Sequence, residues 1–266
     1  MKNKYLFGPV PSRRLGVSLG IDLLPYKTCP LDCVYCERGK TTRLTVKREE
    51  FVPAEEVIKE LQNYLKTGPD LDCVTFSGSG EPTLYSKIDT LIDFIKDNFP
   101  HYRVVVLTNG TLLTQSKVRS QLRRADLVVP SLDAVSEQAF KKVNRPHSSL
   151  VCEEVISGMA QFRKEYKGEI WLEIMIIPGL NDTMEELELM KKTIQDLKPD
   201  RVQLGTLDRP GAVNWIRAVG QEEMERIAAF LGDVELIKSY AARKQIPGGD
   251  RDRETEIIAI LKRRGN

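Results

Sequence analysis

Three cysteines lie within eight residues near the start of the chain, in the stretch TCPLDCVYCE. Cys29, Cys33 and Cys36 follow the spacing Cys-x3-Cys-x2-Cys. A structural zinc site usually has four ligands in two pairs, but no second pair follows and both histidines are far away in sequence. Three thiolates suit an iron–sulfur cluster in which one iron keeps an open position for an exchangeable small molecule. We therefore expect these cysteines to ligate iron, and structural zinc is the alternative.

The bulk composition is that of a soluble globular protein. Of the 266 residues, 41% are hydrophobic and 29% are charged. No apolar run reaches about 18 residues, so no transmembrane helix is predicted, and the N-terminal residues lack the apolar core of a signal peptide. Five cysteines are an odd number, which argues against a disulfide framework. We expect a cytoplasmic protein whose clustered thiols bind metal or take part in redox chemistry.

The charges of the chain nearly cancel. Lys and Arg number 40, Asp and Glu number 38, and the formal net charge is +2. Proteins that bind nucleic-acid phosphates usually carry a basic face. The net charge therefore gives no support to a nucleic-acid or membrane partner, although it leaves a nucleic-acid substrate open.

Strands and helices are predicted to alternate along the chain. Short apolar runs rich in β-branched residues indicate buried strands, and apolar residues at helical spacing indicate the helices between them. The predicted strands cover residues 17–25, 71–78, 102–110, 126–134, 169–182 (ending in a loop) and 200–207. The predicted helices cover residues 53–66, 86–99, 114–125, 136–143, 148–166 and 183–198. This order predicts a six-stranded parallel sheet, either doubly wound or a partial barrel, and the absence of GxGxxG after the first strand argues against a dinucleotide-binding sheet.

The chain is predicted to have one main structural unit. Residues 1–208 contain the six strands and form the core. Residues 209–266 are charged and include IPGGDRDRE, which we expect to be an exposed loop. We interpret this last segment as a short helical appendage that packs on one end of the sheet, without being an independent domain.

Glycines and short polar residues gather where the predicted strands end. Residues 78–81 (GSGE) follow the second strand, Asn109 follows the third, and Ser131 and Asp133 follow the fourth. Parallel α/β folds place their sites at the carboxyl ends of the strands. We therefore expect these residues and the three cysteines to surround one pocket.

The cysteine motif, with the aromatic Tyr35 directly before the last cysteine, resembles the signature of the radical S-adenosylmethionine superfamily. The resemblance implies a partial (βα)6 TIM-like barrel that carries one [4Fe-4S] cluster and S-adenosylmethionine. In that superfamily the reduced cluster cleaves S-adenosylmethionine to a 5′-deoxyadenosyl radical, which abstracts hydrogen from a substrate. Such a cluster is labile to oxygen, so the resemblance also implies anaerobic function and an external electron donor such as flavodoxin or ferredoxin.

Three longer stretches of sequence resemble one subgroup within this superfamily. FGPVPSRRLGVSLGIDLLPYKTCPLDCVYCE, NRPH and WLEIMIIPGLND look like a subgroup of small radical S-adenosylmethionine proteins. This subgroup is similar to the enzymes that build the tricyclic base of wybutosine in transfer RNA. Many relatives carry a second cluster, whereas Cys73 in a predicted strand and Cys152 in a predicted helix are interpreted as core residues. We therefore expect one cluster.

The resemblance also assigns cofactor contacts. GSGE resembles the glycine-glycine-glutamate motif that meets the amino group of S-adenosylmethionine, with a serine in place of the first glycine. It implies that the carboxylate of Glu81 and the neighbouring backbone hold the methionine end, and that polar residues at later strand ends hold the ribose and carboxylate. Helix capping is the alternative for the serine and aspartate after the fourth strand. The implied cofactor-binding residues are Tyr35, Gly78, Ser79, Gly80, Glu81, Asn109, Ser131 and Asp133.

Five further residues are candidates for contact with the substrate. The arginine and histidine of NRPH follow a short helix, a glutamate lies among apolar residues of the fifth strand, and an Asp-Arg pair ends the sixth. A carboxylate in an apolar strand needs a partner. The candidates are Arg145, His147, Glu173, Asp208 and Arg209. The substrate is an RNA nucleoside, a peptide or protein, or a small metabolite, and a non-catalytic zinc protein is the alternative from another class.

Overall fold

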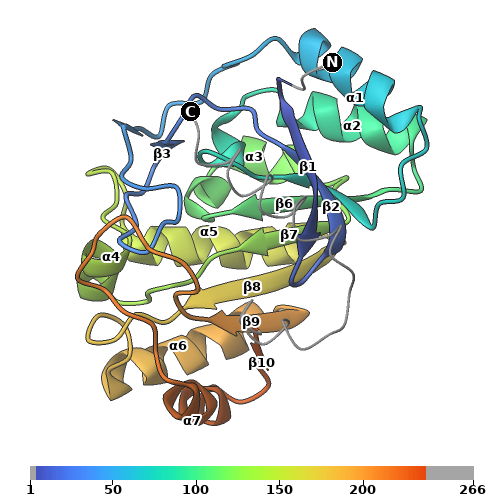
Figure 1. The fold of residues 1–266 in the computed structure, drawn as a ribbon. Coiled ribbons are helices and arrows are strands. Elements are labelled where there is room, and N and C mark those ends of the chain that lie inside the picture. Colours follow the sequence, from blue (N-terminus) through green and yellow to red (C-terminus); the bar gives the residue numbers. More distant parts are fainter. Residues whose placement is uncertain (1–3, 238–266) are drawn as a thin grey trace.

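The computed structural model describes residues 4–237, and Figure 1 shows their arrangement. The strands are β1 (Leu6–Ser12), β2 (Gly16–Ile21), β3 (Thr28–Cys29), β4 (Arg43–Leu44), β5 (Cys73–Phe76), β6 (Arg103–Thr108), β7 (Leu127–Pro130), β8 (Glu169–Met175), β9 (Arg201–Gly205) and β10 (Glu235–Leu236). The helices are α1 (Ala54–Leu65), α2 (Ile88–Asn98), α3 (Ser116–Gln121), α4 (Glu137–Val143), α5 (Cys152–Glu165), α6 (Met184–Leu197) and α7 (Gln221–Leu231). Two short 3-10 helices, η1 (Pro82–Leu84) and η2 (Thr111–Thr114), follow β5 and β6.

The central sheet has the order β1-β2-β5-β6-β7-β8-β9-β10 within the described residues. Neighbouring strands from β2 to β10 run parallel, and only β1 is antiparallel to its neighbour. The six strands expected from the sequence are therefore confirmed, in the expected order, as the parallel part of a curved α/β sheet. Of the two architectures that the sequence left open, this is the partial TIM-like barrel that the family resemblance implied.

Apolar periodicity explains why the helices cover one face of the sheet. In α1, Val57, Leu61 and Leu65 recur four residues apart and are all buried. All four residues of β5 are buried, as expected for a strand covered on both faces. The main core lies between helices and sheet, while a second cluster lies on the opposite face and includes Cys73 and Trp171. The inner face of the barrel is thus apolar at the level where its strands begin.

The structure differs from the sequence prediction at both edges of the sheet. The first residues form β1, which pairs with β2 in a hairpin and was not predicted. After β9 the chain forms a long loop, α7 and then β10, which adds a parallel strand beside β9 instead of a purely helical appendage. The stretch IPGGDRDRE lies outside the described residues. The division at residue 208 stays a prediction.

The structure shows which residues cap α6 and α4. Thr183 caps α6, and its side chain accepts a hydrogen bond from the Glu186 backbone N–H. The Glu186 carboxylate instead accepts from the backbone N–H groups of Val135 and Ser136, at 2.6 and 3.1 Å, and so ties α6 to the start of α4. Ser136 is the residue that caps α4. Helix capping is therefore not the role of Ser131 or Asp133.

Candidate functional site

The cysteine loop, residues 22–48, runs from the end of β2 over the carboxyl ends of the strands. The short β3–β4 pair closes the loop on itself, and the backbone N–H of Thr45 donates to the Cys29 carbonyl at 3.0 Å. A turn brings the N–H of Cys36 to within 3.1 Å of the Cys33 carbonyl oxygen. The N–H of Val34 donates to the Val143 carbonyl at 2.9 Å, which fixes the loop to the end of α4. These backbone bonds hold the three cysteines on one rigid segment.

Each of the three cysteine sulfurs accepts an N–H hydrogen bond from a different part of the chain. Asn109, after β6, places its Nδ2 3.4 Å from the sulfur of Cys29. Asn144, after α4, places its Nδ2 3.4 Å from the sulfur of Cys33. Lys27 places its Nζ 3.0 Å from the sulfur of Cys36. Groups that donate to sulfur stabilise the thiolate, which is the form that binds metal.

Burial and neighbouring negative charges raise the pKa of the Cys29 and Cys33 thiols, and hydrogen bonds to the sulfurs lower it. Burial raises the pKa of Cys29 to about 12, and it raises the pKa of Cys33 well above the usual range. Each of these thiols also interacts electrostatically with at least one other cysteine of the loop. Burial lowers the pKa of Lys27, but the adjacent Cys36 sulfur outweighs it, so the net pKa is raised. Metal binding would replace the thiol protons, and the positive metal would compensate the charge of the buried thiolates.

The glycine-rich turn after β5 lies directly against the cysteine loop. A Cβ atom on Gly80 would lie 2.0 Å from the carbonyl oxygen of Thr28, and Gly78 has φ +134° beside Asp22. The N–H and hydroxyl of Ser79 both donate to the Asp22 carboxylate, at 2.9 and 2.6 Å, and its carbonyl accepts from the Lys27 N–H at 2.9 Å. The close approach that the glycines permit is therefore an approach to the loop that carries the cysteines.

The carboxylate of Glu81 is buried at the rim of the sheet, which is the edge formed by the carboxyl ends of the strands. Its Oε1 accepts from the N–H and hydroxyl of Thr83 and from the hydroxyl of Thr108, and its Oε2 accepts from the N–H of Asn109 at 2.6 Å. Burial raises the pKa of this carboxyl, and these hydrogen bonds lower it, with a net rise. Glu81 thus joins the ends of β5 and β6 and orients the Asn109 side chain that donates to Cys29. Its Oε2 retains acceptor capacity for the predicted amine.

A second buried carboxylate, Asp133, holds the other side of the cysteine loop. Its Oδ2 accepts from the hydroxyl of Tyr35 at 2.5 Å and from the Nδ2 of Asn144 at 2.8 Å, and its Oδ1 accepts from the N–H of Met175 at 3.0 Å. Burial raises its pKa to about 6. The structure thus places Tyr35 and Asp133 in one network with Asn144, the residue that donates to Cys33. Their direct contact with a cofactor stays a prediction.

Three of the predicted substrate residues form ion pairs. Figure 1 shows the β1–β2 hairpin reaching toward β8, and its turn carries two arginines. Arg14 lies 2.8 Å from the carboxylate of Glu173, and Arg13 lies 3.3 Å from that of Asp208. Glu173 therefore has the partner that its position required. Arg209 pairs with Glu37 in the cysteine loop at 2.9 Å.

The remaining predicted residues support the loop backbone. Arg145 has φ +46°, and its carbonyl accepts from the N–H of Asp32 at 3.2 Å. The N–H of His147 donates to the Pro30 carbonyl at 2.8 Å, and its Nδ1 lies 2.9 Å from the Ser149 hydroxyl. Ser131 forms an isolated bridge to Glu173, so these two residues lie side by side at the ends of β7 and β8.

Sequence reasoning missed Lys27, Asn144 and the arginines of the hairpin turn. Lys27 stands two residues before the first cysteine, where a lysine reads as a solvated side chain, yet it is 3% exposed. Asn144 belongs to the NRPH stretch, in which only Arg145 and His147 were predicted as candidates from the sequence. The only available signal was proximity in sequence to a chemical motif, because contacts across the fold decide both roles.

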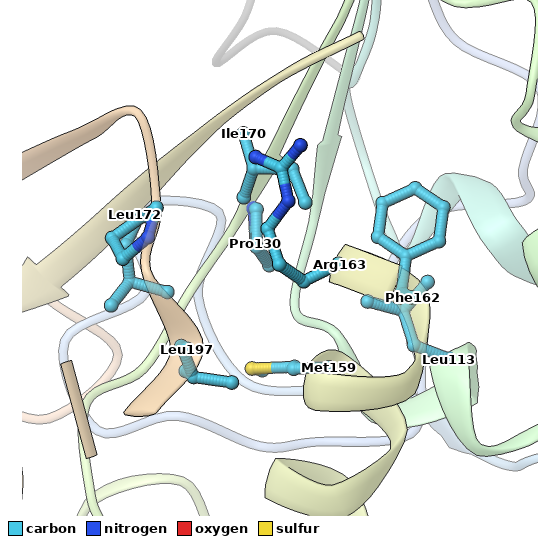
Figure 2. A pocket seen from close by; sticks show the side chains of 9 residues that line it. Leu113, Pro130, Met159, Phe162, Arg163, Ile170, Leu172 and Leu197 are labelled. Atoms are coloured by element: carbon cyan, nitrogen blue, oxygen red, sulfur yellow. The ribbon is translucent and has the colours of Figure 1, made fainter. Parts of the chain in front are cut away.

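Two cavities in the described residues lie away from the cysteine sulfurs. The smaller, about 10 Å³, lies between α5 and the helix-covered face of the sheet (Figure 2). Apolar side chains and Arg163 line it, and its size is that of a packing gap. The larger, about 170 Å³, is lined by residues of η2, Val46 and the segment before α5. Neither contains a cysteine of the loop, so neither is taken as the cofactor site.

The family model described as the radical SAM superfamily matches residues 23–191, a range that spans the cysteine loop and most of the parallel sheet. The chain belongs to the radical SAM superfamily. It is 35% identical over 231 residues to "UPF0026 protein MJ1312" of Methanocaldococcus jannaschii, covering 86% of this chain and 71% of that protein. It is 41% identical over 230 residues to "GTPase Obg" of Brachyspira hyodysenteriae, but spans only 34% of that protein.

A solved structure shares the fold. The structure titled "Structure of TYW1 with a lysine-pyruvate adduct bound" matches with a TM-score of 0.58 and 17% identity, over 80% of this chain and 72% of that one. At this identity the match shows the fold alone, and it supports the TIM-like barrel. The predicted membership in the superfamily is confirmed by the family model, not by this structural match. None of the helices in residues 4–237 is long and apolar enough to cross a membrane.

The loop residues fit the cofactors of this superfamily. Cys29, Cys33 and Cys36 supply three soft sulfur ligands on one segment, and each sulfur has an N–H donor. Among the described residues no three His, Cys, Asp or Glu side chains surround a single point closely enough for one metal ion. Three thiolates on one loop are donors of the kind that iron–sulfur clusters bind.

Proposed function

We propose that the chain is an enzyme that holds one [4Fe-4S] cluster through Cys29, Cys33 and Cys36 and binds S-adenosylmethionine beside it. When bound, the cluster and S-adenosylmethionine supply one-electron cleavage to a 5′-deoxyadenosyl radical that abstracts hydrogen from the substrate. The observation that carries the proposal is one loop with three cysteines, each sulfur with its own N–H donor, in a chain that matches the radical SAM family model.

The rest of the chain positions these sulfurs and shields them. Glu81 fixes Asn109, and Asp133 fixes Asn144, so two buried carboxylates orient two of the sulfur donors. We propose that the free acceptor capacity at the Glu81 Oε2 and the backbone of Gly80 hold the amino end of S-adenosylmethionine. Asn109 and Ser131, at neighbouring strand ends, are proposed to hold its ribose or carboxylate. The buried rim excludes water from the reacting centre.

The substrate is proposed to lie over the inner face of β7 to β9. Trp171 belongs to the inner-face cluster, so Glu173, two residues further along β8, faces the same side. Gln203 is its register partner on β9, and its buried Oε1 has no hydrogen-bond partner among the described residues. An unpaired buried acceptor favours a substrate that presents an N–H or O–H group. This supports a peptide, a nucleoside or a small polar metabolite over an apolar substrate.

The proposed reaction also needs an electron donor and a reducing compartment. We propose a one-electron donor such as flavodoxin or ferredoxin, and a cytoplasmic location, because a cluster with an open iron is labile to oxygen. The net charge of +2 gives no long-range attraction to RNA.

The proposal is tested with anaerobically reconstituted protein. The protein is reduced with dithionite, S-adenosylmethionine is added, and iron, sulfide and 5′-deoxyadenosine are quantified. We expect about four irons per chain and formation of 5′-deoxyadenosine. Stoichiometric zinc without sulfide would contradict the proposal and favour the structural-zinc alternative.

A further inference from the structure

Lys27 is a buried cation whose position is fixed by the backbone. The residue is 3% exposed. Its N–H donates to the Ser79 carbonyl at 2.9 Å, and its carbonyl accepts from the N–H groups of Thr42 and Arg43, each at 3.1 Å. Its φ of +50° lies in the left-handed region that lysine rarely adopts. The chain thus holds Lys27 in a strained conformation, with its side chain inside the cysteine loop.

The ammonium group of Lys27 has sulfur as its partner. In the described part of the chain, the Sγ of Cys36, 3.0 Å from Nζ, is the only side-chain acceptor of a Lys27 hydrogen bond, and no carboxylate pairs with Nζ. A buried lysine normally needs a carboxylate partner, since an isolated buried charge is costly. The sulfur of Cys36, and the group it ligates, must therefore supply the compensating negative charge.

The three sulfur donors differ in charge. Asn109 and Asn144 are neutral and lie 3.4 Å from their sulfurs, whereas Lys27 is a cation at 3.0 Å from Cys36. Hydrogen bonds to cysteine sulfur, net charge and burial all set the reduction potential of an iron–sulfur cluster. A buried positive charge stabilises the state that has gained an electron, because low dielectric strengthens the attraction.

We propose that Lys27 is the charge partner of the [4Fe-4S] cluster and raises the potential at which the cluster accepts an electron from its one-electron donor. The inference rests on the proposed function. In this step one electron moves from the donor to the cluster, no bond breaks, and Lys27 keeps its proton. Lys27 acts on reduction of the cluster, whereas the cysteines act on its binding.

The test compares Lys27→Met with Lys40→Met. Lys40 is an exposed lysine of the same loop, four residues after Cys36, so this matched variant makes the same change in net charge in solvent. The readout is a redox titration of the anaerobic, reconstituted proteins followed by the electron paramagnetic resonance signal of the reduced cluster, with iron and sulfide counted in parallel. S-adenosylmethionine is left out, so the result does not depend on its cleavage.

We expect Lys27→Met to lower the ratio of reduced to oxidised cluster at fixed ambient potential by about tenfold, which is about 59 mV for one electron. Lys40→Met should leave the ratio within about twofold, because solvent screens exposed charge. Lys27→Arg restores the charge and should recover most of the shift. An unchanged potential in a fully loaded Lys27→Met protein, or equal shifts in both methionine variants, would overturn the proposal.

A further variant covers loss of the cluster. If Lys27→Met does not bind iron, Lys27→Gln keeps an N–H donor without the charge and should bind a cluster of lowered potential. Loss of iron in Lys27→Met, Lys27→Gln and Lys27→Arg alike would show that the residue only supports the loop, and would refute the inference. Failure of the proposed function has a separate signature, which is wild-type protein with a cluster but no 5′-deoxyadenosine on adding S-adenosylmethionine.

Discussion

The five cysteines fall into two groups that differ in the direction of their hydrogen bonds. In the cysteine loop, the sulfurs accept from amide or ammonium groups. In the sheet and helices, the thiol of Cys73 donates to the Leu15 carbonyl at 3.5 Å, and that of Cys152 donates to the Ala134 carbonyl at 3.6 Å. A thiol that donates to a carbonyl keeps its proton, whereas a sulfur that accepts N–H groups is prepared to lose it.

Burial alone does not separate the two groups. Burial raises the pKa of both Cys29 and Cys152 to about 12. The difference lies in the polar groups that the fold brings to the sulfur, and those groups come from three separate segments around the cysteine loop. The proposed ligand cysteines therefore differ from the core cysteines in the N–H groups that donate to their sulfurs.

The largest effect is expected from removing one sulfur of each group. Cys33→Ala should abolish the cluster and the cleavage of S-adenosylmethionine, because a ligand is lost. Cys73→Ala should retain both, since Cys73 behaves as a small core residue. Iron and sulfide analysis of the two variants, prepared side by side, measures the difference. If Cys73→Ala also lost its iron, the assignment of ligands would be wrong.

Asp133, which holds the donor of Cys33, should give a pH-dependent stability. Its folded pKa is raised from 3.8 to about 6, so ionised Asp133 costs folding free energy above that pH. At about 1.4 kcal/mol per pKa unit, stability relative to Asp133→Asn should rise by about 3 kcal/mol as the pH falls from 7 to below 4. Urea denaturation of cluster-free wild type and variant across this range tests it. A difference that stays constant with pH would show that Asp133 is not buried as described.

Asn144 links the cysteine loop to the buried carboxylate of Asp133, because its Nδ2 donates both to the Cys33 sulfur and to Asp133. Asn144→Ala leaves a buried carboxylate without one donor, so the free energy of unfolding should fall by about 2 kcal/mol. The exposed Asn98, whose Nδ2 donates to a carbonyl of its own helix, supplies the matched control Asn98→Ala, expected within about 0.5 kcal/mol of wild type. Equal changes in the free energy of unfolding for the two substitutions would show that Asn144 does not stabilise the buried Asp133 carboxylate.

The smallest effect concerns the hairpin turn beside Cys73. Arg14 pairs with Glu173, and both side chains are partly exposed. Arg14→Gln should lower the free energy of unfolding by about 1 kcal/mol, because the charge is lost while glutamine keeps an N–H group that can donate to Glu173. Iron content should not change, because the turn does not touch the cysteine loop sulfurs. A loss of iron in Arg14→Gln would show that the hairpin turn beside Cys73 also supports the cysteine loop, and would contradict the separation of the two groups of cysteines.

The sequence predicts the parallel sheet well, because six short apolar runs and six segments with apolar residues at helical spacing are local signals. It also locates the rim, since Glu81, Asn109 and Asp133 follow strands that end at one edge. The hydrogen bonds between them were not predictable, because Glu81 reaches Thr108 and Asp133 reaches Tyr35 across long sequence separations. The hairpin strand β1 was missed because its pattern, LFGPVPS, contains two prolines and a glycine.

The most direct test of the account is the response of the reduced cluster to S-adenosylmethionine. In the proposed [4Fe-4S] cluster, three ligating cysteines leave one iron without a protein ligand, so adding S-adenosylmethionine to reduced wild-type protein should change the electron paramagnetic resonance spectrum of the cluster. A spectrum that stays the same at saturating S-adenosylmethionine would contradict the account, because the fourth iron would then be closed.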